Sequence, residues 1–341
     1  MSEDKILSDV IKNINKKYGP GTLMDLSNVD EREGVETIST GLPSLDLILG
    51  GGFPKGRIVE LYGPESSGKS TMALHILKSA QEAVGDRKVA YIDAENAFDP
   101  NYAEKLGIDL SRLFLNQPQT GEEALQITET LCETNKISVI VIDSVPCLIP
   151  KAQDDKEIDG TAGMASTARM LAQYLPKIIK AASNSNTVIV FINQIRMKIG
   201  IVYGNPESQP GGMALKFAAS IRLDLRGSKA EERDGREGMK VKFKVKKNKI
   251  APPGRSTEIF LVFGHGFDAD ADLIETAVDF GVINKAGGWY SYGALKEQGM
   301  PSIAKAIREN PEAFAKLKED LLALDVDSRK APEEDEFGNE A

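Results

Sequence analysis

The sequence predicts an α/β fold: a mostly parallel, twisted central sheet flanked by helices, with a small N-terminal helix-strand element and a small C-terminal α/β lobe. Three observations support this prediction. Continuous apolar runs, typical of strands buried on both faces, alternate with helical patterns. The apolar run 57–62 leads directly into a phosphate-loop pattern and then into a helix. Beyond residue 268 the pattern changes to short helices around one aromatic strand.

The composition, with 41% hydrophobic and 27% charged residues among 341, is that of a soluble globular protein. No apolar run approaches the ~20 residues that span a membrane, and the N-terminus lacks the basic start of a signal peptide. Cys132 and Cys147 stand in apolar contexts, so we expect core side chains in a cytoplasmic protein rather than a disulfide. His75 and His265 lie far apart in the sequence, which argues against a histidine-rich metal site or a Ser-His-Asp triad.

The net charge of −9 is unevenly distributed. Residues 325–341 contain seven acidic and two basic residues, a net charge of −5, so the remainder of the chain carries −4. This acidic tail lacks apolar periodicity, and we expect it to be disordered. Local basic patches therefore say more about a nucleic-acid partner than the total charge does.

The N-terminal element, residues 1–33, begins with a predicted helix whose apolar residues recur at helical spacing from Ile6 to Ile14. The pattern breaks at the Gly-Pro-Gly run 19–21. A helix this short cannot bury its apolar stripe alone, so it must pack on the main domain or on a neighbouring copy. The residues themselves leave both partners open.

The phosphate-loop pattern G-x-x-x-x-G-K-[ST] occupies residues 63–70. Backbone N–H groups and the following helix N-terminus are suited to hold phosphate oxygens. Lys69 should reach the terminal phosphates, and the Ser70 hydroxyl should bind Mg²⁺. The alternative is a glycine-rich turn that binds nothing. We assign the following residues to nucleotide binding: Gly63, Pro64, Glu65, Ser66, Ser67, Gly68, Lys69, Ser70 and Thr71.

Polar side chains end three predicted strands, 88–95, 138–144 and 187–194. They are Glu95, Asp143 and Gln194, and ligands of an open parallel sheet bind at this carboxyl edge. Asp143 fits the acid that orients the magnesium shell. Glu95 is placed to orient and deprotonate an attacking water, although a solvated strand-end carboxylate is the alternative.

Helices are predicted at 122–132 and 164–182, the second broken or kinked at Pro176. Two long segments, about 150–165 and 195–212, have no strong periodicity. The second starts directly after Gln194 and contains Arg196, Lys198 and Tyr203. This composition suits single-stranded nucleic acid, and the position suits a nucleotide-driven switch. A flexible surface loop is the alternative.

Two period-two runs, 221–226 and 240–246, predict half-buried strands joined by a turn at 231–235. The second run places Lys240, Lys242, Lys244 and Lys246 on one face. That face is either a DNA-backbone patch or the solvated face of an edge strand. Further helices are predicted at 272–280, 302–309 and 311–324, with a strand at 287–292, as a separate lobe.

The residues closely resemble the RecA family of bacterial homologous-recombination ATPases, from about Asp30 to Leu324. The resemblance implies a RecA-type P-loop NTPase core at 34–268, an oligomerisation element at 1–33, a C-terminal lobe at 269–324 and the acidic tail at 325–341. Pro176, Met213 and Gly254 depart from the family's usual residues, which leaves open a phage or mobile-element copy. The matching strings are Gly63–Ser70, Ile92–Asn96, Val141–Val145, Phe191–Gly200, Gly204–Glu207, Ala214–Phe217 and Lys247–Ala251.

The resemblance also implies roles for single residues. Tyr102 matches the aromatic residue that stacks on adenine, and Gln194 matches the sensor of the γ-phosphate. Phe263 stands near the nucleotide where the family usually has a tyrosine. Lys247 and Lys249 match lysines that reach the ATP of the neighbouring subunit, in the manner of an arginine finger. The implied subunit-interface residues are Lys216, Phe217 and Arg222. The implied DNA-binding residues are Met164, Arg169, Arg196, Lys198, Ile199, Gly211, Gly212, Lys242 and Lys244.

By this resemblance the chain is a DNA-dependent ATPase that uses ATP and Mg²⁺. It would polymerise on single-stranded DNA, exchange strands with a homologous duplex in DNA repair, and activate self-cleavage of an SOS-type repressor. Implied partners are single- and double-stranded DNA, further copies of the chain, and loading or mediator proteins, in the cytoplasm and without a membrane. Two other readings remain: a phosphate-loop kinase for a small molecule, and a ring-forming relative such as a replicative helicase or clock-type ATPase.

Overall fold

The computed structural model describes residues 3–19, 22–23, 35–83, 85–151, 160–197 and 207–324, without the side chains of 3–5 and 160–165. The chain divides into two compact units, Met1–Glu36 and Thr37–Ala341. In the first unit α1 (Glu3–Tyr18) is amphipathic, and Ile6, Leu7 and Val10 are exposed. The strand expected in the N-terminal element and the acidic tail lie outside the described residues.

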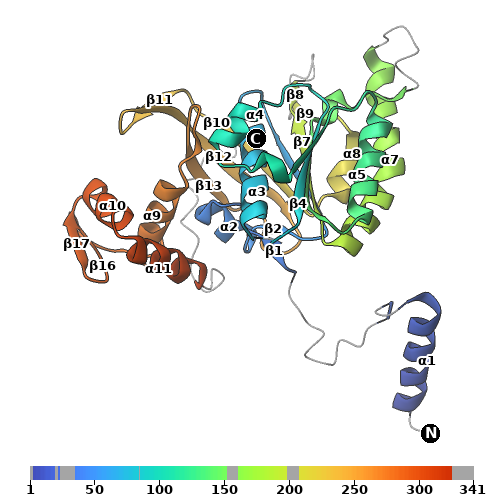
Figure 1. Cartoon of the computed structure of the whole chain (residues 1–341), viewed down its shortest axis with the longest axis horizontal. Helices are drawn as coiled ribbons and strands as arrows, with labels where there is room; N and C mark the ends of the chain where they lie inside the picture. Colours follow the sequence, from blue (N-terminus) through green and yellow to red (C-terminus); the bar gives the residue numbers. More distant parts are fainter. Residues whose placement is uncertain are drawn as a thin grey trace, which may run out of the picture. The chain divides into compact units, whose positions relative to one another are not determined.

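The second unit is built on a sheet of ten strands within the described residues (Figure 1). Its order is β14-β13-β12-β10-β3-β7-β6-β4-β5, and β11 pairs with β12. The run from β10 to β5 is parallel, and β10 to β14 is antiparallel. The bounds are β3 (Ile58–Gly63), β4 (Lys88–Asp93), β5 (Leu113–Asn116), β6 (Ile137–Asp143), β7 (Val188–Gln194), β10 (Ile221–Gly227), β11 (Glu231–Arg233), β12 (Arg236–Asn248), β13 (Ser256–Val262) and β14 (Gly266–Phe267).

Helices cover both faces of the sheet, as the continuous apolar strands predict. In β6, Val139 and Val141 join one core with α3, while Ile140 and Ile142 join the other with α5 and α7. The alternation follows from the two-residue repeat of a strand. The predicted mostly parallel α/β fold is thereby confirmed. The covering helices are α2 (Pro43–Leu49), α3 (Lys69–Ala83), α4 (Pro100–Lys105), α5 (Gly121–Glu133), α7 (Gly160–Ser185) and α8 (Gly212–Ala218).

Three expectations about these elements are corrected. Residues 231–233 form β11 rather than a turn, and the turn is Asp234-Gly235, whose positive φ values of 53° and 71° suit a two-residue hairpin. Strand β12 lies between β10 and β13, so the lysine row is not on an edge strand. Helix α7 continues through Pro176, so it is not broken there, and a kink at Pro176 stays a prediction. Strands β5 and β13 were not predicted, because β5 is only four residues long and β13 begins with three polar residues and shows no two-residue repeat.

The C-terminal segment has its own apolar core, which Leu47 of α2 joins. It contains three strands rather than the single one predicted, because the two outer strands are only three and four residues long and mostly polar. None of the described helices is long and apolar enough to cross a membrane. The remaining elements are α9 (Ala269–Asp279), β15 (Asn284–Ala286), β16 (Trp289–Tyr292), β17 (Leu295–Gln298), α10 (Met300–Arg308), α11 (Pro311–Leu322), and the short strands β1 (Thr37–Ile38), β2 (Phe53–Pro54), β8 (Arg196–Met197) and β9 (Glu207–Ser208).

Two carboxyl groups are buried at α2, and one of them, Asp272 of α9, connects the two helices. The Ser44 N–H donates to Asp272 Oδ2 at 3.0 Å, and Asp46 accepts from the Thr40 N–H and hydroxyl at 2.8 and 2.7 Å. Burial raises the pKa of each carboxyl group to about 6. These folded-state pKa values lie above those of the unfolded chain. The contribution of the two protonated carboxyl groups to the free energy of unfolding is therefore fully present below pH ~4 and is lost as the pH rises through about 6.

Asp272→Asn is therefore expected to raise the free energy of unfolding at pH 7.5 by up to about 3 kcal/mol. The amide keeps an acceptor for Ser44 and removes the buried charge. The gain should disappear near pH 4, where wild-type Asp272 is protonated in the folded state. Urea denaturation at both pH values measures it, with Asp270→Asn, an exposed position of the same helix, as control. An equal effect at both pH values would contradict the assigned cause.

Candidate nucleotide site and DNA-binding surfaces

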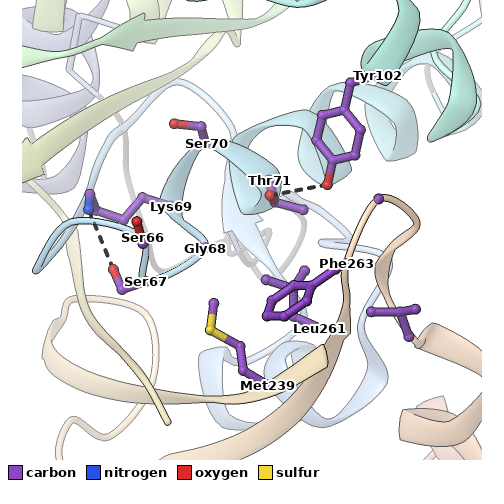
Figure 2. Close-up of a pocket in the computed structure, with 12 residues that line it drawn as sticks. Ser66, Ser67, Gly68, Lys69, Ser70, Thr71, Tyr102, Met239, Leu261 and Phe263 are labelled. Atoms are coloured by element: carbon purple, nitrogen blue, oxygen red, sulfur yellow. Dashed lines mark hydrogen bonds between the residues drawn. The ribbon is translucent and has the colours of Figure 1, made fainter. Parts of the chain in front are cut away.

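A pocket of about 300 Å³ opens between the phosphate loop and the end of β13 (Figure 2). Predicted loop residues 66–71 and both predicted aromatic residues, Tyr102 and Phe263, line it, whereas Gly63, Pro64 and Glu65 do not. Met239, Leu261, Val262 and Gly264 also line it and were not predicted. For Leu261, Val262 and Gly264 the only sequence signal of a binding role is that they lie next to Phe263. Met239 offers none, because the sequence does not show where its strand lies in the sheet. The lining residues are Ser66, Ser67, Gly68, Lys69, Ser70, Thr71, Tyr102, Met239, Leu261, Val262, Phe263 and Gly264.

Lys69 folds back over the phosphate loop. Its Nζ donates to the carbonyl oxygen of Pro64 and lies 3.4 Å from Ser67 Oγ. Ser67 Oγ itself donates to the Pro64 carbonyl at 2.9 Å. Burial lowers the pKa of Lys69, and the carboxylates of Asp143, Glu95 and Glu65 oppose that effect. The loop therefore presents a partly desolvated ammonium group, which an anion would stabilise.

Ser70 and Asp143 meet at the carboxyl end of the sheet, as predicted. Ser70 Oγ donates to Asp143 Oδ2 at 2.8 Å, and the Tyr91 hydroxyl donates to the same oxygen at 2.6 Å. Burial raises the pKa of Asp143, although both donors favour its anionic form. A hydroxyl and a carboxylate are hard oxygen ligands that fit Mg²⁺. In the part of the chain that is described, no cluster of three or more His, Cys, Asp or Glu could hold a metal. Nucleotide phosphates and water would therefore have to complete a magnesium shell.

Glu95 is joined to Gln194 and Ser144. Ser144 Oγ donates to Glu95 Oε1 at 2.5 Å, and Gln194 Nε2 donates to the same oxygen at 2.9 Å. Glu95 itself is exposed, whereas Ser144 is fully buried. The parallel register brings the ends of β4, β6 and β7 together, so three polar residues far apart in the sequence share one edge. A carboxylate held at one oxygen keeps the other for a water molecule.

Tyr102 and Phe263, the two aromatic residues predicted to lie near the nucleotide, come from α4 and from the β13–β14 turn. The Tyr102 hydroxyl lies 3.3 Å from Thr71 Oγ1, and Asp99 caps α4 so that Tyr102 is held in its first turns. Phe263 is 44% exposed, which leaves its ring available to a planar ligand. Figure 2 shows Tyr102 above Phe263 across the pocket.

Lys247 and Lys249 do not line the pocket of their own chain. Lys247 Nζ instead donates to the carbonyl oxygens of Lys216 and Phe217, at 2.7 and 3.0 Å, at the end of α8. Burial, and then the charge of Lys249, lower the pKa of Lys247. Phe217 is 69% exposed beside this pair. The predicted interface residues Lys216 and Phe217 and the paired lysines thus form one surface patch.

Arg222, the third predicted interface residue, is bound inside the protomer. Its Nε donates to buried Glu60 at 2.5 Å, its Nη2 donates to Gln209 at 2.6 Å, and its guanidinium lies 4.9 Å from the Tyr62 ring centroid. Its side chain is 14% exposed. The interface role of Arg222 stays a prediction. Its contacts with Glu60, Gln209 and Tyr62 lie within the protomer and stabilise the folded chain.

The two predicted DNA loops are described only at their roots. Arg169 and Arg196 are exposed, on α7 and β8, and Gly211 caps α8, which begins at Gly212. Strand β8 pairs with β9 and so holds the two ends of the second loop together. The side chain of Met164, together with Lys198 and Ile199, lies outside the described residues.

The lysine row is exposed on one face of β12, as predicted. Carboxylates stand beside it: Asp224 of β10 is opposite Lys244, and Glu258 of β13 is opposite Lys242. Lys240 Nζ lies 3.9 Å from Glu231. Arg226 of β10, however, stands opposite Lys242 and pairs with Asp224 at 2.7 Å, so the carboxylates offset only part of the positive charge of the row. DNA binding by Lys242 and Lys244 remains a prediction.

Comparison with known proteins identifies the family. A family model described as the RecA N-terminal domain matches residues 5–268, and one described as the RecA C-terminal domain matches 271–324. Protein RecA of Thermus thermophilus is 47% identical over 325 residues, 94% of each chain. Protein RecA of Chlorobium chlorochromatii is 46% identical over 317 residues, 92% of this chain and 89% of that one. The predicted resemblance is confirmed: this chain is a DNA-dependent ATPase with a recombinase role in DNA recombination and repair, and it belongs to the RecA family.

Proposed function

We propose that this protein polymerises on single-stranded DNA, with ATP and Mg²⁺ held between successive protomers, and exchanges the bound strand with a homologous duplex. The observation that carries the proposal is the hydrogen bond from Gln194 to Glu95. Gln194 ends β7 and directly precedes the second loop, while Glu95 is the candidate base for ATP hydrolysis. A group that contacts both the γ-phosphate and the loop root can make DNA binding depend on the nucleotide.

Within this proposal each residue of the site has a role. Lys69 and the loop N–H groups hold the phosphates, Ser70 and Asp143 bind Mg²⁺, and Glu95 deprotonates the attacking water. Mg²⁺ would supply charge neutralisation at the phosphates. Tyr102 and Phe263 would hold the adenine. Lys247 and Lys249 of an adjacent protomer would neutralise charge in the transition state, which explains why they are absent from the pocket of their own chain.

The polymer would assemble through residues 1–33 and the Lys216–Phe217 patch. The exposed apolar side chains of α1 support that role, because a surface stripe of this kind stabilises a helix only when it is buried against a partner. DNA would contact Met164, Arg169, Arg196, Lys198, Ile199, Gly211 and Gly212 at the two loops, and Lys242 and Lys244 on the sheet. Activation of an SOS-type repressor and loading by mediator proteins are proposed from the family resemblance alone.

Strand exchange tests the proposal directly. Purified protein, ATP and Mg²⁺ are expected to convert a circular single strand and a homologous linear duplex into joint molecules and exchanged products. Electron microscopy with a non-hydrolysable ATP analogue should show helical filaments on the single strand. Closed rings would favour a helicase-like relative, and a protein that stayed monomeric with ATP, Mg²⁺ and oligonucleotide would contradict the proposal.

A further inference from the structure

The nucleotide pocket has two main walls, which come from separate segments of the chain. One wall is the phosphate loop and the start of α3, residues 66–71. The other is the end of β13 and the following turn, residues 261–264. The two walls lie far apart in the sequence, so the spacing between them depends on tertiary contacts (Figure 2).

His75 of α3 makes such a contact. Its Nε2 accepts a hydrogen bond from the Phe267 N–H at 3.0 Å, and the two rings meet edge to face with centroids 5.3 Å apart. Phe267 belongs to β14, the outermost strand of the sheet in the described residues. The Asp268 N–H donates to the Phe260 carbonyl of β13, so the N–H of the preceding Phe267 faces away from β13. His75 satisfies this donor, which would otherwise be left unpaired in a partly buried place.

The β13–β14 turn is short, so an anchor at Phe267 acts on the pocket wall. Val262 pairs with Gly266 and Leu261 with Phe267, which leaves three residues, Phe263 to His265, in the turn. The Phe263 N–H donates to the Glu237 carbonyl at 3.0 Å. The turn is thus attached to β12 on one side and to α3 on the other.

Gly266 shows how closely the turn approaches His75. A Cβ added at Gly266 would lie 2.6 Å from His75 Nε2 and 2.6 Å from Leu106 Cδ2, and its φ of +86° is strained for other residues. Burial, with the charge of Lys78, lowers the pKa of His75 to about 4. The ring is neutral at pH 7, so Nε2 is free to accept.

We propose that His75 is a positioning residue that sets the distance between the phosphate wall and the β13–β14 wall, and so the fit of the base end of the nucleotide. This inference rests on the assignment of the pocket to ATP. His75 does not line the pocket and acts through Phe267 and the turn. Its loss should weaken ATP binding and leave the hydrolytic step, which depends on Glu95, nearly unchanged.

Steady-state ATPase measurements with single-stranded DNA provide the test. His75→Phe keeps an aromatic ring but removes the acceptor, and we expect the KM for ATP to rise about ten-fold with kcat within about two-fold. His75→Gln offers an amide oxygen near the position of Nε2, and both constants should stay within about two-fold of wild type. Glu82→Gln, an exposed position on the same helix, is the matched control. An unchanged KM in His75→Phe, or an equal rise in His75→Gln, would overturn the inference.

Two further measurements keep the test decisive if His75→Phe does not fold. Gly266→Ala should push the turn away from His75 and raise the KM in the same way. In the wild-type protein, hydrogen exchange should be slow at the Phe267 amide, and fast exchange there would contradict the contact. If wild type and Glu82→Gln both failed to bind ATP, the assignment of the pocket would be wrong. If wild type and Glu82→Gln both bound ATP, and His75→Phe had the same KM for ATP as they do, only the proposed role of His75 would be wrong.

Discussion

Lys247→Ala is expected to lower DNA-stimulated ATP hydrolysis by roughly 10³-fold or more, the lower end of the range in which cationic fingers act. The physical reason is that burial, and then the charge of Lys249, disfavour the charged form of Lys247, and an incoming polyphosphate would offset both effects. ATP binding by an isolated protomer should be unchanged, because Lys247 does not line its own pocket. ATPase rates with and without oligonucleotide, and ATP titration of the monomer, measure the two effects.

The control for this variant must separate lost catalysis from lost folding. Lys247 also binds two carbonyl oxygens of α8, so the alanine variant should be slightly less stable. Lys229→Ala removes an exposed lysine with no assigned role and should keep full activity. Melting temperatures of all variants show whether the loss exceeds destabilisation. A Lys247→Ala protein with normal DNA stimulation would remove the lysine from the reaction.

Glu95→Gln is expected to slow hydrolysis roughly 10²- to 10⁴-fold while ATP and DNA binding persist. Glutamine keeps the shape of the side chain and an oxygen that can accept from Ser144 and Gln194, so the edge of the sheet should stay intact. It cannot take a proton from water. Single-turnover hydrolysis with pre-bound ATP and DNA measures the chemical step, and Glu104→Gln, exposed on α4, is the control. Normal turnover would exclude Glu95 as the base.

A mixture of the two variants tests whether Lys247 acts on a neighbour. In a filament of both proteins, some seams join the intact Glu95 of a Lys247→Ala protomer to the intact Lys247 of a Glu95→Gln protomer. Random assembly at equal concentrations would make about a quarter of the seams active, because each head-to-tail contact draws one side from each protomer. Neither protein alone should turn over appreciably. If the mixture were as inactive as its components, the lysine would act within its own chain.

Local patterns in the sequence were sufficient for the phosphate-binding half of the site. The loop 63–70 is contiguous, so the spacing of its glycine, lysine and serine residues can be recognised without knowledge of the tertiary structure. The apolar strands ending in Asp143 and Gln194 also predicted the meeting with Ser70 and Glu95, because parallel strands present their carboxyl ends at one edge.

The sequence by itself therefore determined the α/β class, the phosphate loop and the polar edge of the sheet, each of which depends on contiguous residues or on strand periodicity. Only the tertiary structure decided the other wall of the pocket, where His75 meets Phe267 across 192 positions, and the pairing of Arg222 with Glu60 across 162. It also placed β12 inside the sheet, which puts carboxylates beside the lysine row. Such contacts depend on the order of strands in the sheet, which no local pattern specifies.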